Sequence, residues 1–476
     1  MLRKIRIGLA AVFWIGITLL FLDITGALHG YLDWMAKIQF LPAFLALNVS
    51  VVLGLVLLTL VFGRLYCSVI CPLGVTQDII SHIGTRKSKA PYKYRKSVKW
   101  LRYGVWVLFV VCLVAGVNVV VALLAPYGAY GRMVNSLQDA VSGHVAWPTA
   151  IVALVTLVII GVLAFKGGRT YCNSICPVGT TLSFFSRFAM FRPMIDASQC
   201  VRCHSCERKC KAHCIEITKE NVGIDYSRCV DCFNCIDSCP KGGLKYRFAW
   251  RKEMPDQVGH DEGRRAFMTG TAVAVGALAL KGIEARAQEA AQKVDGGLAE
   301  VLPKQALKRE IPITPPGSKS VKHFYQHCIA CQLCVAECPN GVLRPSANPE
   351  HLMQPEMGYE KGFCRPECTR CSQVCPAGAI KPITKEEKTQ YHIGTAHVDL
   401  TACISATGKS LCGKCSSMCP AGAIHMVTID DKPTPAVNEQ LCIGCGACEQ
   451  YCPVRPISAI TVNGKYEHID SSLRSE

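Results

Sequence analysis

The spacing of its cysteines constrains this chain more than any other feature. Thirty cysteines occur in 476 residues, and most of them fall into six groups of four. Four groups read C-x2-C-x2-C-x3-C, a run that wraps a cubane 4Fe-4S cluster with three close thiolates and sends the fourth to a neighbouring cluster. We therefore expect six 4Fe-4S clusters. The groups are Cys200, Cys203, Cys206 and Cys210; Cys229, Cys232, Cys235 and Cys239; Cys328, Cys331, Cys334 and Cys338; Cys364, Cys368, Cys371 and Cys375; Cys403, Cys412, Cys415 and Cys419; and Cys442, Cys445, Cys448 and Cys452.

Zinc sites and disulfides are the competing interpretations. A zinc ribbon uses two C-x2-C knuckles with a longer gap between them, and has no use for a third cysteine and a Cys-Pro further on. Three thiols within seven residues cannot all reach distant disulfide partners without strain. The least regular group has eight residues between Cys403 and Cys412, but the Cys-Pro-Ala-Gly-Ala-Ile stretch at Cys419 repeats the one at Cys375. Iron–sulfur clusters remain the favoured interpretation.

The fourth-cysteine rule predicts which thiols share a cluster. In the first two groups we expect Cys200, Cys203, Cys206 and Cys239 on one cluster, and Cys229, Cys232, Cys235 and Cys210 on the other. Cys210 is followed by Lys211 rather than proline, and Cys214 lies four residues on, so either thiol could be the ligand. For the four later groups we expect a nested arrangement, first with fourth and second with third. The nested sets are Cys328, Cys331, Cys334 and Cys452; Cys442, Cys445, Cys448 and Cys338; Cys364, Cys368, Cys371 and Cys419; and Cys403, Cys412, Cys415 and Cys375.

The first third of the chain is strongly apolar. Half of all residues are hydrophobic and the mean hydropathy is +0.24, which is high for a soluble protein. Apolar runs at about 7–28, 43–63, 101–125 and 149–165 are long enough, or nearly so, to cross a hydrocarbon layer of about 30 Å. The expected fold is a membrane α-helical bundle of four spans over 1–195, with two α+β modules of the bacterial ferredoxin type. The first of these modules is expected at 196–250 with two clusters.

Loop charges orient the bundle. The N-terminus carries Arg3, Lys4 and Arg6, and the loop between the second and third runs is rich in Lys and Arg with one acid, Asp78. By the positive-inside rule both ends of the bundle face the cytoplasm of a bacterial inner membrane, and residues 196–250 are cytoplasmic. These loops account for part of the net charge of +17. No basic stripe with interleaved aromatics is present, so we expect no nucleic-acid partner.

A second targeting pattern lies in mid-chain. Gly263-Arg264-Arg265 is followed by a Gly/Ala-rich apolar stretch and by Ala285-Arg286-Ala287. Paired arginines, a short apolar region and an A-x-A pattern predict a twin-arginine signal or anchor over 263–287. Residues 288–322 read as a linker, and 323–476 as a periplasmic module with four clusters. Whether the chain is cleaved after Ala287 stays open.

The bundle contains an internal repeat. Residues 63–74 read GRLYCSVICPLG and residues 168–179 read GRTYCNSICPVG. Helical spacing places Cys67 with Cys71, and Cys172 with Cys176, on one face each. Incidental thiols at a membrane-exit turn are the alternative. Because the same thiol pair occurs twice, we favour a redox, metal or quinone-adjacent role for these four cysteines.

Together these motifs resemble two known families joined end to end. Residues 1–250, with Cys67/Cys71-Pro72 and Cys172/Cys176-Pro177, resemble the NapH family of membrane proteins with a cytoplasmic two-cluster module. Residues 263–476 resemble NapG, an exported four-cluster protein. The related MauN and MauM pair serves methylamine dehydrogenase, and the regulator NosR shares the membrane part. The resemblance implies a component that oxidises quinol from the membrane pool. Its partner would be a periplasmic multihaem cytochrome or a molybdenum-type reductase.

Two hypotheses of function follow. The first is a quinol-linked electron carrier, a quinol dehydrogenase component rather than a stand-alone catalyst, feeding a periplasmic respiratory reductase. The second is a maturation or redox-maintenance factor that passes cytoplasmic electrons outward to a periplasmic metalloenzyme. The chain has no C-x2-C-H haem motif and no Gly-rich nucleotide fingerprint, so no haem c or NAD(H) site of its own is expected.

Overall fold

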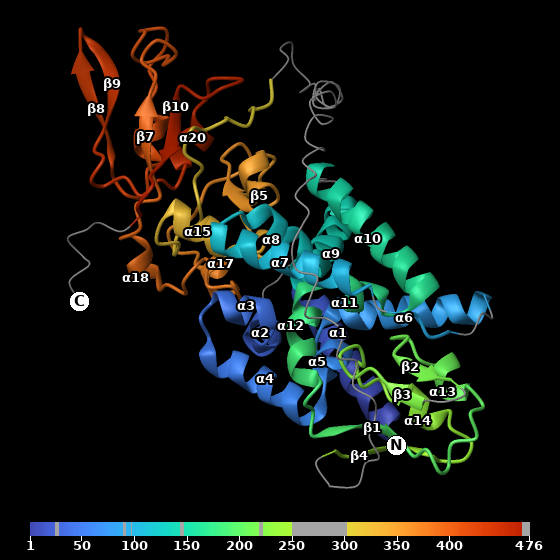
Figure 1. Cartoon of the computed structure of the whole chain (residues 1–476). Helices are drawn as coiled ribbons and strands as arrows, with labels where there is room; N and C mark the ends of the chain where they lie inside the picture. Colours follow the sequence, from blue (N-terminus) through green and yellow to red (C-terminus); the bar gives the residue numbers. More distant parts are fainter. Residues whose placement is uncertain are drawn as a thin grey trace.

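The computed structural model describes residues 1–23, 28–88, 92–96, 98–142, 147–218, 222–249 and 302–468. A bundle of helices forms the centre, and two regions of short strands and helices lie beyond it (Figure 1). The segment predicted as a twin-arginine signal, residues 263–287, lies outside the described residues.

Four helices correspond to the four apolar runs. They are α1 (Leu2–Leu22), α4 (Val49–Phe62), α7 (Lys99–Ala115) and α10 (Trp147–Gly167). Among the described residues, α1 and α10 have 21 residues each and are long and apolar enough to cross a membrane. The helix α4 is apolar but has 14 residues, and α7 has 17 residues. Two spans are therefore supported by length and composition, and the full set of four stays a proposal.

Shorter helices connect these four. At one end lie α2 (His29–Lys37), α3 (Phe40–Leu45), α8 (Asn118–Leu124) and α9 (Pro126–Ser142). The repeat forms two matching pairs, α5 (Leu65–Val69) with α6 (Pro72–Ser88), and α11 (Thr170–Ser174) with α12 (Pro177–Ser186). In each pair a Cys-Pro step separates the two helices, because proline cannot donate the hydrogen bond that would continue the first helix but fits the first turn of the next.

The first module is a small α+β unit. Its elements are β1 (Phe191–Ile195), α13 (Ser205–Arg208), β2 (Ile215–Ile217), β3 (Val222–Ile224), α14 (Asn234–Asp237) and β4 (Leu244–Phe248). The strand β1 pairs antiparallel with β4, placing Phe191 opposite Phe248, and β2 pairs with β3. The module therefore begins at Phe191, five residues before the predicted boundary at 196, because β1 supplies the partner of its last strand.

The second module contains two units in sequence. The first unit comprises α15 (Val321–His327), α16 (Leu333–Ala336), β5 (Leu343–Pro345), the 3-10 helix η1 (Pro349–His351), β6 (Pro355–Met357), α17 (Arg370–Gln373) and α18 (Lys385–Lys388). The second comprises β7 (Gly394–Val398), α19 (Lys414–Ser417), β8 (Ile424–Ile429), β9 (Lys432–Val437), α20 (Ala447–Tyr451) and β10 (Ile460–Gly464). Here β7 pairs with β10 and β8 with β9, which repeats the pairing of the first module.

The predicted linker is partly wrong, because its last part packs on the second module. Arg309 donates to the Val462 carbonyl and forms an ion pair with Glu449 at 2.6 Å. Ile313 is fully buried. The prolines at 312, 315 and 316 restrict the backbone to an extended course, and the segment from about 304 to 320 lies along the module rather than acting as a free tether.

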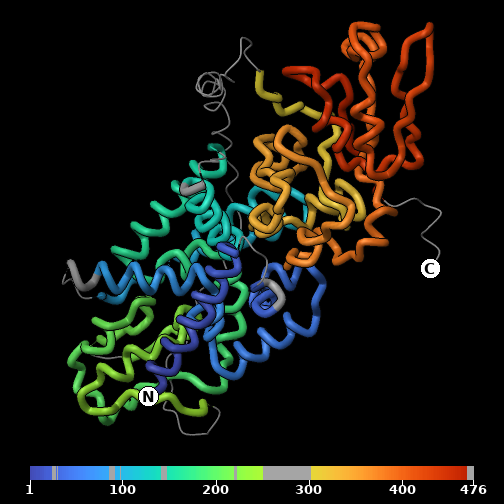
Figure 2. The backbone as a smooth tube through the Cα atoms, turned by 180° about the vertical axis from the view of Figure 1, so that it is seen from behind, coloured from blue at the N-terminus to red at the C-terminus, as the bar shows by residue number. Residues whose placement is uncertain are grey.

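The two modules lie at opposite ends of the bundle (Figures 1 and 2). The first module meets the N-terminus, where Arg3 pairs with Asp237. The second module meets the α2–α3 and α8–α9 regions. There Arg132 donates to the Ala330 carbonyl at 3.3 Å and Asn135 donates to the Gln332 carbonyl at 3.3 Å. Which sides of a membrane the two modules face stays a proposal.

Candidate iron–sulfur sites

The four regular cysteine runs share one backbone conformation. In each run the residues just before and just after the second cysteine have positive φ: Arg202 and His204, Asp231 and Phe233, Ala330 and Gln332, Gly444 and Gly446. Alternation of this kind curls a loop and turns successive N–H groups inward, which creates a concavity for an anion. The N–H groups of Ala330 and Leu333 accordingly donate to the thiols of Cys328 and Cys331.

One of the irregular runs uses a side chain for the same purpose. Lys388, buried on α18, donates to the Cys364 Sγ at 3.2 Å and to the carbonyl of Cys368 at 2.5 Å. Hydrogen bonds to the sulfurs are one of the means by which proteins set cluster potentials. In this run, where three residues separate Cys364 from Cys368, a charged side chain thus donates to a cysteine sulfur.

The first module brings its thiols together as predicted by the fourth-cysteine rule. One hollow is lined by the thiols of Cys200, Cys203, Cys206 and Cys239. Burial raises the pKa of the Cys206 thiol to about 11, with repulsion from Cys200 and Cys239 adding to the shift. A second hollow is lined by Cys210, Cys214, Cys229, Cys232 and Cys235. Ligation at both sets stays a proposal.

Cys210 and Cys214 both lie beside the second set, but they have different neighbours there. Burial raises the pKa of Cys235, and the neighbouring thiols that add to the shift are Cys232, Cys229, Cys210 and Cys206. Cys214 instead lies between Cys210, whose Sγ is 3.4 Å away, and Cys229. Cys214 hydrogen-bonds both Cys210 and Cys229, and the choice of Cys210 as the fourth ligand stays a proposal.

The nested pairing predicted for the second module is wrong. The thiols of Cys403, Cys412, Cys415 and Cys452 line one hollow, and those of Cys442, Cys445, Cys448 and Cys419 line another. In the first unit, Cys375 is a near neighbour of Cys328, Cys331 and Cys334. Cys338 is likewise a near neighbour of Cys364 and Cys371, in the same run as Cys368. Consecutive groups are paired, first with second and third with fourth.

The reason lies in how the short helices pack. The short helix that carries the third cysteine of a run contacts the corresponding helix of the next run: α13 with α14, α16 with α17, and α19 with α20. The nested arrangement would require α16 to pack on α20. Consecutive pairing closes shorter loops, whose ordering costs less conformational entropy.

The arrangement of the thiols fits clusters better than zinc or disulfides. All thirty cysteines are free thiols. Among the described residues, no three His, Cys, Asp or Glu side chains converge closely enough to hold a single metal ion. Zinc draws its sulfurs to about 2.3 Å from one point, whereas the corners of a cubane keep its ligands apart. Each set would hold a 4Fe-4S cluster through four thiolates, and the cluster would supply one-electron chemistry.

The four cysteines of the internal repeat also lie together. All four are buried. Cys172 interacts electrostatically with Cys67, with Cys71 and with Cys176. The sequence predicted one face for each pair but not that the two pairs would meet. Their role stays a proposal.

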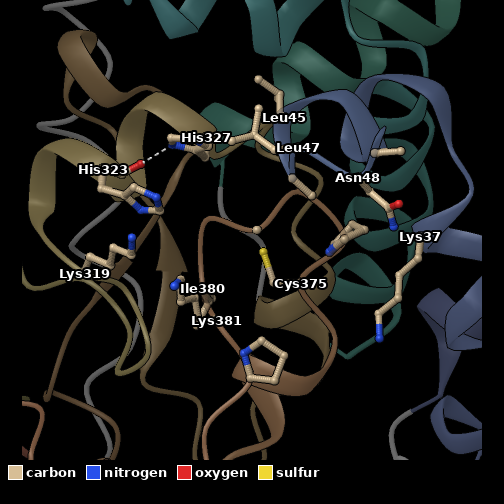
Figure 3. A pocket seen from close by; sticks show the side chains of 15 residues that line it. Lys37, Leu45, Leu47, Asn48, Lys319, His323, His327, Cys375, Ile380 and Lys381 are labelled. Atoms are coloured by element: carbon tan, nitrogen blue, oxygen red, sulfur yellow. Dashed lines mark hydrogen bonds between the residues drawn. The ribbon is translucent and has the colours of Figure 1, made fainter. Parts of the chain in front are cut away.

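A cavity of about 390 Å³ lies where the second module meets the bundle. Figure 3 shows the Cys375 sulfur directed into it, with His323 and His327 on one side and Lys37 and Asn48 of the bundle on the other. The His327 ring lies 2.9 Å from the His323 carbonyl and stacks on the His323 ring at 4.1 Å. The Nδ1 atom of His323 is buried without a hydrogen-bond partner. The sequence did not single out these histidines, although their spacing of four residues just before Cys328 was a usable signal.

Comparison with known proteins agrees with the cysteine geometry. Residues 44–91 and 148–194 match the family described as "4Fe-4S binding domain", and residues 192–254 and 410–455 match "4Fe-4S dicluster domain". The chain is 31% identical over 105 residues to the ferredoxin-type protein NapF of Escherichia coli, covering 22% of this chain and 61% of NapF. It is 30% identical over 99 residues to the methylamine utilization ferredoxin-type protein MauM of Methylobacillus flagellatus, covering 20% and 42%. The chain is a ferredoxin-type iron–sulfur electron-transfer protein.

A longer similarity joins this chain to an archaeal protein. Over 197 residues this ferredoxin-type protein is 27% identical to an uncharacterized protein of Methanocaldococcus jannaschii, with 40% of this chain and 67% of the archaeal protein aligned. The similarities therefore support the ferredoxin character of the chain. The specific resemblance to a fused NapH and NapG pair stays a proposal.

Proposed function

We propose that this protein takes electrons from a membrane quinol and passes them through its second module to a periplasmic reductase. The cavity at the junction of the bundle and the second module carries the proposal. Its volume lies in the range of ligand pockets. Apolar residues of α3, Ala43 and Leu45, and Leu47 of the turn before α4 form part of its wall. A quinol ring and the start of its tail would find an apolar surface there.

Quinol oxidation needs proton acceptors as well as an electron acceptor. His323 and His327 can provide the first, and the thiol set containing Cys375 would hold the second. Burial lowers the pKa of His323 to about 4, and the positive charges of His327, Lys319 and Lys381 add to the shift. The imidazole is therefore neutral near pH 7, and its unpartnered Nδ1 can accept a quinol proton or donate to the ring oxygen, depending on the tautomer.

The second module offers a route away from the cavity. Cys371 is a near neighbour of Cys334, and the Cys364 N–H donates to the Cys445 carbonyl at 2.9 Å. The last hollow, lined by Cys403, Cys412, Cys415 and Cys452, lies in the unit farthest from the bundle. A periplasmic multihaem cytochrome or molybdenum-type reductase would receive electrons at that end.

The experiment that tests this function is redox titration of membranes containing the full chain, followed by electron paramagnetic resonance. Added quinol is expected to reduce the clusters of the second module first. Clusters that stay oxidised with excess quinol, but are reduced by dithionite, would contradict the proposal.

A second function is favoured by the first module. Its hollow at Cys210 lies next to the bundle, because Lys211 contacts Asp78 at 3.4 Å. Electrons from a cytoplasmic donor could therefore enter at this end and serve a maturation or redox-maintenance role. In the same titration, reduction of the first module by a reduced ferredoxin or flavodoxin, without quinol, would favour this alternative.

A further inference from the structure

We propose that Cys67, Cys71, Cys172 and Cys176 together hold one further iron–sulfur cluster, shared between the two copies of the repeat. Neither copy has four cysteines, because each supplies two. The structure places all four thiols in one buried group within the bundle. This site does not depend on the proposed quinol cavity.

The backbone around these thiols is built to receive an anion. The N–H of Gly179 donates to the Cys176 Sγ at 3.4 Å, and the N–H of Gly74 donates to the thiol of Cys71. A side chain at either glycine is excluded. A Cβ at Gly74 would lie 2.2 Å from the Cys67 carbonyl oxygen, and one at Gly179 would lie 2.4 Å from that of Cys172. The two Cys-Pro turns are thus matched in both their donors and their tight packing.

Two fully buried arginines tie the copies together. The Arg64 guanidinium donates to the Cys172 carbonyl at 3.2 Å and to the Asn173 side chain at 2.8 Å. The Arg169 guanidinium donates in turn to the Cys67 carbonyl at 2.6 Å. Each arginine also approaches a thiol of its own copy: Arg64 lies 3.8 Å from the Cys67 Sγ, and Arg169 lies 3.9 Å from the Cys172 Sγ.

The buried charges around the four thiols do not balance. Arg6, Arg64 and Arg169 are buried there, and Lys211 lies beside them. Asp78 pairs with Arg6 and Arg169 at 2.8 Å each and with Lys211 at 3.4 Å. Within the described part of the chain, no carboxylate lies within 4.0 Å of the Arg64 guanidinium. Asp231 is also buried beside Arg64, where it accepts from the Arg64 backbone N–H rather than from the guanidinium, so two carboxylates face four cations.

Unpaired buried cations are strongly unfavourable. Three nitrogen atoms of these arginines, Arg6 Nε, Arg64 Nε and Arg169 Nη2, are buried without a hydrogen-bond partner. An iron–sulfur cluster with four thiolate ligands carries net negative charge and accepts hydrogen bonds at its sulfurs. Such a group would supply both the missing charge and the missing acceptors.

A single zinc ion or a disulfide fits less well. The four thiols are free, and no three potential ligands in the described residues converge on one point. Cys67 and Cys172 lie in the short helices α5 and α11, and the non-helical turns that carry Cys71 and Cys176 are acceptable at membrane depth because they are buried in protein. Intramembrane charges of this kind mark functional sites by default.

The proposed site lies between the thiol sets of the two modules. On one side Asn173 donates to the Ala212 carbonyl, two residues from Cys210. On the other side Tyr171 is a neighbour of Cys172 and Cys176, and buried Arg132 is a neighbour of both Tyr171 and Cys331. The thiol sets thus form one series through the bundle. The cluster would accept one electron from the thiol set of one module and pass one electron to that of the other module. No proton would move and no bond would break.

Iron and sulfide content tests the site. The full chain, purified anaerobically, should contain about 28 irons rather than about 24. The variant Cys71→Ser with Cys176→Ser should lose about four irons and as many sulfides, and one component of the Mössbauer spectrum. Cys112→Ser, at a buried cysteine of α7 outside the group, should keep all of them. A double variant with unchanged iron content and an unchanged spectrum would overturn the proposal, as would stoichiometric zinc.

A second variant tests the site even if the cysteine double variant misfolds. Arg64→Gln removes one positive charge and leaves all four thiols. It should retain the iron and shift the reduction potential of one cluster to a more negative value, while the signals of the modules keep theirs. If every cluster of this variant kept its wild-type reduction potential, the proposal of a cluster beside Arg64 would be contradicted.

Electron transfer from the first module through the bundle to the second module can be measured separately. In proteoliposomes with the first module outward, dithionite, which does not cross the bilayer, should reduce the clusters of both modules. In the Cys71→Ser, Cys176→Ser variant only the first module should be reduced. Because no quinol is present, failure of the quinol proposal would not affect this result. Reduction of the second module at the wild-type rate in the variant would contradict the relay.

Discussion

Asp78 and Arg169 form a buried ion pair at 2.8 Å, although they lie 91 positions apart in the chain. The pair joins α6, which follows the first copy of the repeat, to the start of the second copy. Arg6 of α1 reaches the same carboxylate at 2.8 Å. Three distant segments therefore converge on one acid.

Replacing Asp78 with Asn should destabilise the bundle severely, because it leaves buried cations without their counter-charge. A loss of about 3–5 kcal/mol in the free energy of unfolding is expected for breaking a buried pair. Denaturant unfolding in detergent would measure it. The matched control is Asp237→Asn, whose pair with Arg3 is 40% and 44% exposed and is worth at most about 1 kcal/mol. Equal losses in the two variants would refute the argument.

Cys210→Ser and Cys214→Ser should behave differently. Loss of Cys210 removes a ligand from the second set of the first module, so the iron content and one electron paramagnetic resonance signal should decrease. Loss of Cys214 removes a sulfur that lies beside Cys210 and Cys229, so the iron should remain and one potential should shift. If Cys214→Ser alone lost the cluster, the ligand assignment would be reversed.

Consecutive pairing in the second module can be checked by combining substitutions. Cys452→Ser and Cys415→Ser affect the same set, so the double variant should lose no more iron than either single variant. Cys452→Ser with Cys334→Ser affects two sets and should lose roughly twice as much. Iron analysis of the purified variants distinguishes the arrangements. The nested arrangement predicts the opposite result, because it places Cys452 with Cys334.

Lys388→Met should lower the reduction potential of one cluster in the second module. The amine of Lys388 donates to the Cys364 Sγ, and removal of a positive charge and a hydrogen bond disfavours the reduced, more negative form. Potentiometric titration measures the change. Lys385, exposed on the same helix, provides the control, and Lys385→Met should leave every potential unchanged. A shift of similar size in the control would mean that helix α18 acts only through long-range charge.

His323→Phe should slow the reduction of the clusters by quinol and leave their reduction by dithionite unchanged. His397→Phe, at an exposed position of β7, should affect neither. The pKa of His323 is lowered to about 4, so its ring is neutral and able to accept a proton above about pH 5. Quinol-dependent reduction should therefore depend little on this group between about pH 5 and 8, and fall as the pH drops through about 4. Equal rates for wild type and His323→Phe would remove this residue from the quinol site.

The sequence predicted the cluster loops well because they are local structures. The spacing within Cys200–Cys210 or Cys442–Cys452 determines the turn, and consecutive residues supply its donors. The pairing of runs was predicted correctly in the first module, where one arrangement exists, and wrongly in the second, where helix packing decides among several. The meeting of Cys67 with Cys172 depends on how two helical hairpins pack, and spacing carries no information about that.

The junction cavity could not be read from the sequence for a related reason. Its wall combines Lys37 and Asn48 of the bundle with His323 and Lys381 of the second module. The described structure also extends the second module back to about residue 304, because contacts such as Arg309 with Glu449 join segments more than a hundred residues apart. Long-range contacts of this kind leave no periodic trace in a sequence.

The exchange of arginines between the two copies of the repeat has a consequence for the chain's ancestry. In a polypeptide with one copy, the hydrogen bonds made by the Arg64 guanidinium and the Cys67 carbonyl would have needed a second molecule. The present arrangement therefore corresponds to a symmetric dimer linked into one chain. Linking frees each half to diverge. That divergence is visible at Asp78, whose counterpart in the second copy is Ser183. A symmetric dimer would have an acid at both positions, whereas this chain has it at one.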